Sequence, residues 1–262
     1  MATPQVSVIS VTRNDLAGIQ RTRASVLAQQ GASIQHIVVD GASTDGTVAW
    51  LQQQRWTKPS AFISQADDGI YDAMNRGAAL ATGSLIIFLN GGDTFPRSWT
   101  VREVVEHWQA YGWQWAYGIT VLTKGDGRVS RIHQFAPFSR VRLGFGLSAV
   151  PHQATWMQTD FFKQIGGYRV AASLSADMDL CWAACQVAPP VLIGEVLSIA
   201  EEGGVSAQQG PGYYAKAMRA NVKHHGASVT GNRTLDAIAA WGMVLWTSIV
   251  QIIPTWWAKR HS

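Results

Sequence analysis

Short apolar runs alternate with helical patterns along the first half of the chain. Residues 16–31 place apolar side chains near one face of a helix, and residues 48–54 and 73–81 are also typical of helices. The runs between them have the length and the composition of buried strands and cover residues 6–11, 36–39, 61–64 and 85–89. Strands that alternate with helices form parallel sheets through right-handed crossovers. The pattern predicts an α/β fold with a Rossmann-like, mostly parallel sheet and helices on both faces.

The second half of the chain has a more mixed pattern. Two predicted strands, at residues 115–122 and 128–133, are joined by a Lys-Gly-Asp-Gly turn typical of a hairpin. The other predicted elements are helices at 96–108, 159–165 and about 177–185, and a strand at 191–200. We therefore expect one domain over residues 1–233, with an α/β half up to residue 110 and a mixed half from residue 111.

Polar loops follow the predicted strands. The segment 67–93 reads as loop, helix, strand and loop, and it carries Asp67 and Asp68 at one end and Asp93 at the other. Open α/β sheets bind ligands outside the carboxyl ends of their strands. These carboxylates are therefore candidate ligand-binding groups, and an ordinary surface turn is the alternative for Asp93.

The composition narrows the class of protein. A chain of 262 residues with 47% hydrophobic and 15% charged residues is typical of one large folded domain. The net charge of +4 suits a phosphate-bearing or anionic partner, but no basic run is interleaved with aromatic residues, so we expect no nucleic acid partner. Cys181 and Cys185 lack zinc-site spacing and are expected to be reduced core thiols. With no secretory signal pattern at the N-terminus, these features favour the cytoplasm.

Six segments in the same order resemble the family 2 glycosyltransferases, which have the GT-A fold. They span residues 5–206 and read VSVISVTRN, VVDGASTDGT, DDGIYDAMNRGAALATG, FLNGGD, SADMDL and GGVS. The third and fourth are most similar to bacterial exopolysaccharide and glycolipid enzymes of the colanic-acid type. The resemblance implies inverting transfer of a sugar from a nucleotide-diphosphate donor to an acceptor hydroxyl, on a lipid-linked saccharide or glycolipid in cell-surface polysaccharide synthesis.

The resemblance also assigns a donor site. A UDP-sugar is the default donor, and GDP- or dTDP-sugars stay open. His152 is expected to touch the acceptor or the donor phosphate, with a purely structural histidine as the alternative. The remaining donor-binding positions that the resemblance implies are Thr12, Asn14 and Asp40 for the nucleotide, Asp68 for the base, Asn75 and Arg76 for the sugar or diphosphate, and Gly92.

The metal and the catalytic base follow from the same resemblance. The Asp-x-Asp metal motif of the family aligns with the segment 90–93, where Asp93 is the remaining carboxylate for Mg²⁺ or Mn²⁺. Asp177 aligns with the catalytic base. Asp179 is its rival, but two helical steps turn about 200°, so the two side chains cannot face one pocket together. A solvated helix N-terminus is the alternative interpretation for both residues.

The C-terminal segment 234–262 predicts an apolar helix. No charged residue occurs between 237 and 258, and Lys259 and Arg260 follow at once. Tryptophans and basic residues suit a membrane interface. We expect this helix to bind the inner face of the plasma membrane peripherally, or else to pack against the domain or in a homo-oligomer. The loop 203–206 is expected to order when the donor binds.

Two other function classes compete with a glycosyltransferase. A non-catalytic nucleotide-sugar-binding or scaffold protein of a polysaccharide assembly complex would explain the reduced metal motif, but it has no need of Asp177. A nucleotidyltransferase would carry a glycine-rich basic loop after the first strand, and residues 12–18 (TRNDLAG) lack that character.

Overall fold

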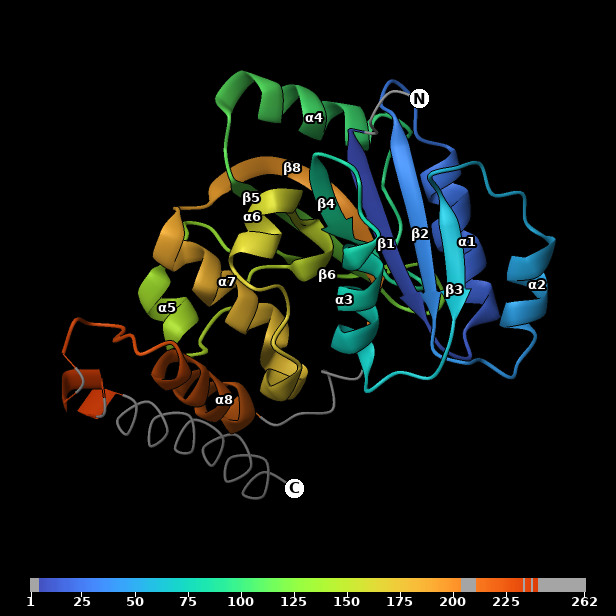
Figure 1. Ribbon diagram of the computed structural model, residues 1–262. Coiled ribbons are helices and arrows are strands. Elements are labelled where there is room, and N and C mark those ends of the chain that lie inside the picture. The colour runs from blue at the N-terminus through green and yellow to red at the C-terminus, as the bar shows by residue number, and fades with distance from the viewer. Residues whose placement is uncertain (1–4, 204–210, 233, 237, 240–262) are drawn as a thin grey trace, which may run out of the picture.

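A single sheet organises the computed structural model, which describes residues 5–203, 211–232, 234–236 and 238–239 (Figure 1). Within these residues the sheet has eight strands in the order β3-β2-β1-β4-β7-β5-β6, and β8 also pairs with β5. The strands are β1 (Val6–Thr12), β2 (Ile34–Asp40), β3 (Ala61–Ser64), β4 (Leu85–Phe88), β5 (Trp115–Thr123), β6 (Val129–His133), β7 (Thr155–Gln158) and β8 (Val191–Glu201).

The pairing of the strands follows the two halves of the sequence. The strands β1 to β4 are all parallel. β7 lies antiparallel between β4 and β5, while β5 pairs antiparallel with β6 and parallel with β8. The mixed α/β sheet confirms the predicted fold class, but β7 was not predicted.

Helices cover both faces of the sheet. Side chains of a strand alternate between its two faces, so Ile9 and Val11 face one core and Val6 and Val8 face the other. The first core includes residues of α3 and α5 to α8, and the second includes residues of α1 and α4. The helices are α1 (Leu16–Leu27), α2 (Thr47–Gln53), α3 (Ile70–Ala79), α4 (Thr100–Tyr111), α5 (Arg140–Gly144), α6 (Thr159–Gln164), α7 (Ala176–Val187) and α8 (Pro211–His224), with 3₁₀ turns η1 (His152–Ala154) and η2 (Val170–Ser175).

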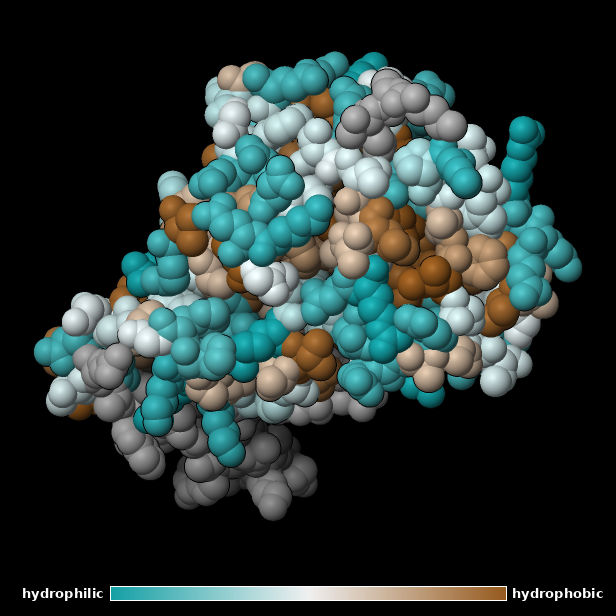
Figure 2. All heavy atoms as spheres, in the orientation of Figure 1, coloured by the Kyte–Doolittle hydropathy of each residue, from teal (hydrophilic) through white to brown (hydrophobic). Residues whose placement is uncertain are grey.

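Helix α3 lies unusually close to the sheet. A Cβ atom on Gly77 would come within 2.5 Å of the Ile9 Cγ2 atom, so only glycine permits this approach. The contact fixes α3 across β1 and β2 and holds the loop before it at the carboxyl edge of the sheet (Figure 1). Towards the outer edge the residues of β3 are partly buried or exposed, and Figure 2 shows hydrophobic side chains at the surface in this region.

Several smaller predictions are also decided by the fold. Cys181 is buried and Cys185 partly buried, and both are free thiols in α7, as expected. The predicted strand and helix positions recur with shifts of up to four residues, since α4 begins at Thr100 rather than residue 96 and α1 ends at Leu27 rather than residue 31. No helix among the described residues is long and apolar enough to cross a membrane. Residues 237 and 240–262 of the predicted tail and residues 204–206 of the predicted donor loop lie outside the described part of the chain.

Candidate functional site

The loops after β1 and β2 are tied together by Asn14. Its backbone N–H donates to the Ser43 hydroxyl (2.7 Å), and its side-chain oxygen accepts from the Thr44 backbone N–H (2.8 Å). Asn14 has a positive φ of 50°, a conformation that asparagine tolerates better than most residues. Its role in the structure is therefore to shape the rim of the site, and direct contact with a nucleotide stays a prediction.

Asp40 lies at the end of β2, fully buried beneath these loops. Its Oδ2 atom accepts hydrogen bonds from the Ser43 backbone N–H (3.0 Å) and the Ser64 hydroxyl (2.7 Å). The other carboxylate oxygen, Oδ1, and the buried Thr12 hydroxyl have no partner among the described residues. Buried polar atoms without partners are rare, so the ends of β1 and β2 supply unsatisfied groups where a ligand is expected.

Of the two acidic residues before α3, Asp67 lies against Gly41, the residue that follows Asp40. A Cβ atom on Gly41 would lie 2.6 Å from the Asp67 Oδ2 atom, whereas Asp68 is exposed. The backbone N–H of Asp68 donates to Asp72 in the first turn of α3 (3.1 Å). Asp67 is thus a candidate that the sequence analysis named but did not assign, and the base-reading role of Asp68 stays a prediction.

Asn75 and Arg76, both predicted to contact the donor, hold protein segments together. The Asn75 side chain donates to the Tyr168 carbonyl oxygen (2.7 Å) and accepts from the Tyr168 N–H (3.0 Å), so both its nitrogen and its oxygen already have a protein partner. Arg76 donates to the Ala66 carbonyl oxygen (2.7 Å) and pairs with Asp72 (2.6 Å). Both residues fix the position of α3, and a donor contact by either one stays a prediction.

The loop after β4 carries Asp93, and helix α1 holds the backbone of this loop in place. The Thr22 hydroxyl of α1 lies 2.9 Å from the Asn90 carbonyl oxygen and 2.7 Å from that of Asp93. Gly92 has a φ of +93°, a backbone conformation that favours glycine. Asp93 is 7% exposed, and its Oδ2 atom accepts from the Asn90 N–H (3.2 Å). Burial raises the pKa of Asp93 to about 8.

Asp93 is the carboxylate that would hold a metal ion. Among the described residues, no group of three His, Cys, Asp or Glu side chains is arranged to bind one. A second carboxylate lies beside the loop, because a Cβ on Gly91 would be 3.4 Å from the Asp15 Oδ2 atom, but Asp15 also caps α1 through Gly18. Mg²⁺ and Mn²⁺ accept one or two protein carboxylates and complete their shell with phosphate oxygens and water. The residues therefore fit a cation held jointly with a bound diphosphate.

Asp177 lies in the first turn of α7 and approaches this loop from the other half of the chain. Its Oδ1 atom accepts from the Met178 N–H (2.8 Å), and its Oδ2 atom lies 3.8 Å from the His152 Nδ1 atom. The Tyr71 hydroxyl of α3 also interacts with Asp177. Burial raises the pKa of Asp177 to about 6. A carboxylate with this pKa is largely ionised at neutral pH and is a stronger base than an exposed one.

His152 connects Asp177 to the loop of Asp93. The Asn90 side-chain amide lies 3.4 Å from the His152 Nε2 atom. Burial lowers the pKa of His152 to about 4, so the imidazole is neutral at neutral pH. Since an amide nitrogen only donates, Nε2 accepts and the proton lies on Nδ1, which faces Asp177. His152 and Asp177, both predicted site residues, thus meet in the structure.

Asp179 faces the opposite way, as the helical rotation predicts. Its carboxylate accepts two hydrogen bonds from Arg169 (3.0 and 3.1 Å) and lies 3.0 Å from His225 Nε2. Its side chain is only 3% exposed. Asp179 is therefore a buried structural anchor, which leaves Asp177 as the acidic residue of α7 that faces the site.

Sequence reasoning did not assign Tyr71 or Asn90. Both lie inside motifs that were recognised, but their partners come from the second half of the chain, at Asp177 and His152. These contacts arise only when the chain folds, so the sequence carried no local signal for them. The Asn90 Oδ1 atom is also buried without a partner among the described residues.

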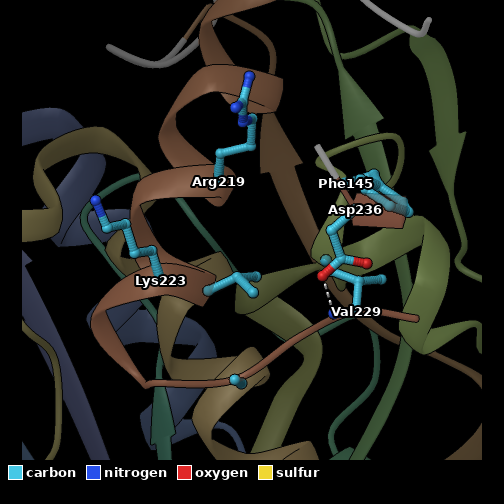
Figure 3. Close-up of a pocket in the computed structure, with 8 residues that line it drawn as sticks. Phe145, Arg219, Lys223, Val229 and Asp236 are labelled. Carbon is cyan, nitrogen blue, oxygen red and sulfur yellow. Dashed lines mark hydrogen bonds between the residues drawn. The ribbon is translucent and has the colours of Figure 1, made fainter. Parts of the chain in front are cut away.

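A separate cavity lies away from this site, between α5, α8 and residues 227–236. Its volume is about 340 Å³ and it shares no lining residue with the groups above. In Figure 3, Arg219 and Lys223 project from α8, while Asp236 bonds to the backbone of Val229 (2.7 Å). The candidate site is therefore the edge of the sheet between Asp40, Asp93 and Asp177, not this cavity.

Comparisons of the sequence with known proteins show which family it matches. The family described as Glycosyl transferase family 2 matches residues 7–166. An uncharacterized glycosyltransferase of Mycobacterium tuberculosis is 37% identical over 214 residues, which cover 79% of both chains. A PGL/p-HBAD biosynthesis glycosyltransferase of Mycobacterium bovis is 29% identical over 79% of this chain and 80% of its own.

Solved structures share the fold at low sequence identity. The 1–349 part of Staphylococcus aureus TarS, in complex with UDP-GlcNAc, superimposes with a TM-score of 0.66 at 17% identity, over 84% of this chain and 66% of that one. Against a longer TarS chain, the match covers 39% of its length. The mannosyltransferase PcManGT of Pyrobaculum calidifontis, in complex with GDP-Man and Mn²⁺, has a TM-score of 0.58 at 16% identity, over 95% and 84% of the two chains.

Proposed function

From the premise that the chain belongs to glycosyl transferase family 2 and has the GT-A fold, we propose that it transfers a sugar from a nucleotide-diphosphate donor to an acceptor hydroxyl with inversion. The observation that carries this proposal is the meeting of Asp177 with the loop of Asp93 through His152 and Asn90. A base and a diphosphate-facing loop are thereby held on one edge of the sheet.

In this proposal the Asp177 carboxylate accepts the proton of the acceptor hydroxyl. The hydroxyl oxygen attacks the anomeric carbon as the bond to the nucleotide diphosphate breaks, and the attack from the opposite face inverts the configuration. A base with a pKa of about 6 is ionised at neutral pH and still accepts a proton well. His152 is neutral and therefore carries no charge to the site, and its role in this proposal is to orient Asp177.

The nucleotide is proposed to lie over the ends of β1 and β2. The unpaired Asp40 Oδ1 atom and Thr12 hydroxyl support this placement, with Asp67 beside them over Gly41. We retain a UDP-sugar as the default donor. A TarS structure contains UDP-GlcNAc and the PcManGT structure contains GDP-Man, so both bases occur on this fold.

We propose that Asp93 shares Mg²⁺ or Mn²⁺ with the donor diphosphate. The ion would supply Lewis-acid stabilisation of the negative charge on the leaving diphosphate. The buried carboxylate and the Mn²⁺ of the PcManGT complex support this assignment. Asp93 would be the protein ligand, and the Asn90 N–H would keep its carboxylate oriented.

The acceptor is proposed to be a lipid-linked saccharide or a glycolipid. A relative with 29% identity carries a name that places it in PGL/p-HBAD biosynthesis. The apolar segment 234–262 would bring the site to the inner face of the membrane, which leaves the protein on the cytoplasmic side.

The test is transfer activity with a panel of UDP-, GDP- and dTDP-sugars and a glycolipid extract as acceptor. We expect one donor class to give a metal-dependent product of inverted configuration, and Asp177→Asn to nearly abolish its formation while the donor still binds. A protein that binds a nucleotide sugar but transfers nothing to any acceptor would instead be the scaffold.

A further inference from the structure

A second cavity lies at the other end of the sheet from the candidate site. It has a volume of about 300 Å³, and its lining includes Ile34 and His36 at the start of β2 and Ser60 just before β3. Asp40 ends β2 four residues after His36, a separation of about 13 Å along a strand. In Figure 1 this is the end at which the β1 and β2 arrows begin, near the N-terminus. The cavity is therefore distinct from the proposed donor site.

The lining of this cavity is positively charged. It contains three cationic residues, Arg23, Arg55 and Lys58, and no Asp or Glu among the described residues that line it. Arg55 and Lys58 are exposed on the loop after α2, while Arg23 is in α1. Cations that converge without a carboxylate between them favour an anionic ligand.

Arg23 is the unusual member of this group because it is only 5% exposed. Its Nη2 atom donates to the Arg55 carbonyl oxygen (2.9 Å), and its guanidinium lies 4.0 Å from the centre of the Trp56 ring. The Nε atom is buried without a hydrogen-bond partner, and no described carboxylate lies within ion-pair distance of Arg23. A buried charge without a counter-charge is costly.

His36 adds neither a positive nor a negative charge to the cavity. It is 3% exposed, its Nε2 atom pairs with the Ser10 hydroxyl (3.0 Å), and its Nδ1 atom is buried without a partner. Burial and the nearby Arg23 lower the pKa of His36 to about 3, so it is neutral at physiological pH. Two polar groups that line the cavity, Arg23 and His36, thus each keep an unused nitrogen.

We propose that this cavity binds a small phosphate-bearing anion at a site separate from the donor site. A phosphate accepts several hydrogen bonds from arginine in its planar fork geometry and would supply the counter-charge that Arg23 lacks. The volume lies at the lower end of the range for small-molecule pockets, which suits a compact phosphate or phosphate ester rather than a whole nucleotide sugar. This site does not depend on the proposed sugar transfer.

The experiment measures pyrophosphate and inorganic phosphate binding by calorimetry, with the full chain in metal-free buffer. The test variant is Arg55→Gln with Lys58→Gln, because both side chains are exposed and neither forms a hydrogen bond or an ion pair with another described residue. The matched control is Arg128→Gln with Lys163→Gln, which removes the same charge from exposed positions outside the cavity.

We expect wild type and control to bind pyrophosphate alike and the test variant to bind roughly tenfold more weakly or worse. Chloride at the same ionic strength should not displace bound pyrophosphate from the cavity as inorganic phosphate does. Equal affinity of all three proteins would place any binding elsewhere, including the donor site, and overturn the proposal. Absence of phosphate and pyrophosphate binding to wild type would overturn it as well.

Discussion

The Nδ1 atom of His152 lies 3.8 Å from the Oδ2 atom of Asp177, and the other ring nitrogen of His152 faces the side-chain amide of Asn90. This places a neutral histidine between the proposed base and the loop of Asp93. The separation exceeds hydrogen-bond length, so a small side-chain movement would complete the contact. Each residue of the proposed site can therefore be replaced and tested on its own.

Replacement of Asp177 by Asn should remove the base without removing a hydrogen-bond acceptor for the Met178 N–H. We expect kcat to fall by about 10²–10⁴-fold while the donor affinity stays within about twofold. Asp160→Asn is the control, since Asp160 is an exposed acidic residue in the first turn of α6. Full turnover by Asp177→Asn, measured with initial rates and donor titration, would exclude it as the base.

The rate should depend on pH through Asp177. The carboxylate must be ionised to act as a base, and burial raises its pKa to about 6. We expect kcat/KM to rise about tenfold per pH unit below pH 6 and to level off above it. A profile that is flat between pH 5 and pH 7 would contradict this assignment.

Tyr71→Phe should shift that profile. The Tyr71 hydroxyl interacts with Asp177 and helps to lower the pKa of its carboxyl, against the larger effect of burial. Without the hydroxyl we expect the rising limb to move to higher pH, with much of the plateau rate retained. Tyr111→Phe is the matched control because Tyr111 is 72% exposed. An unshifted limb in Tyr71→Phe would mean that the hydroxyl does not act on Asp177.

Asp93 should make the stability of the metal-free protein depend on pH. An unfolded Asp ionises near pH 4, but burial raises the pKa of Asp93 to about 8 in the folded state. The folded state therefore binds one more proton between these values, and its stability falls by up to about 1.4 kcal/mol per pH unit as pH rises. Thermal unfolding of wild type and Asp93→Asn from pH 5 to pH 9 measures this effect. We expect wild type to lose stability relative to Asp93→Asn, and a constant difference would contradict the raised pKa.

Asn75→Ala should destabilise the protein because it leaves the Tyr168 N–H and carbonyl without their partner. We expect a loss of about 1–3 kcal/mol in the free energy of unfolding, measured in urea. Gln52→Ala, on an exposed position of α2, should cost much less. A stable Asn75→Ala variant with weakened donor binding would favour the donor contact that the sequence predicted.

Sequence patterns predicted those parts of the fold that depend on local order. The β-branched run of β1 and the acidic first turn of α7 are both visible in the chain, and helical rotation alone separated Asp177 from Asp179. Strand β7 was missed because its four residues follow a 3₁₀ turn and carry no periodic pattern of their own. It becomes a strand only through pairing with β4 and β5.

Distant partners limited what could be predicted for the site. Asn75 lies in a recognisable motif, but its partner Tyr168 is 93 positions away. Likewise, the motif around Asp67 and Asp68 did not reveal which of the two side chains would lie against Gly41. A motif identifies the residues of a site, whereas tertiary packing decides which of them are free to meet a ligand.

The position of β7 has a consequence for how the chain can be divided. Because β7 pairs with both β4 and β5, residues from the second half complete the sheet begun by the first. A fragment that ends near residue 110 would leave β4 as an unprotected edge strand, open to pairing with other chains and to aggregation. The two halves of the chain, to which we assign the nucleotide and the base, therefore share one sheet, and we expect neither to fold well without the other.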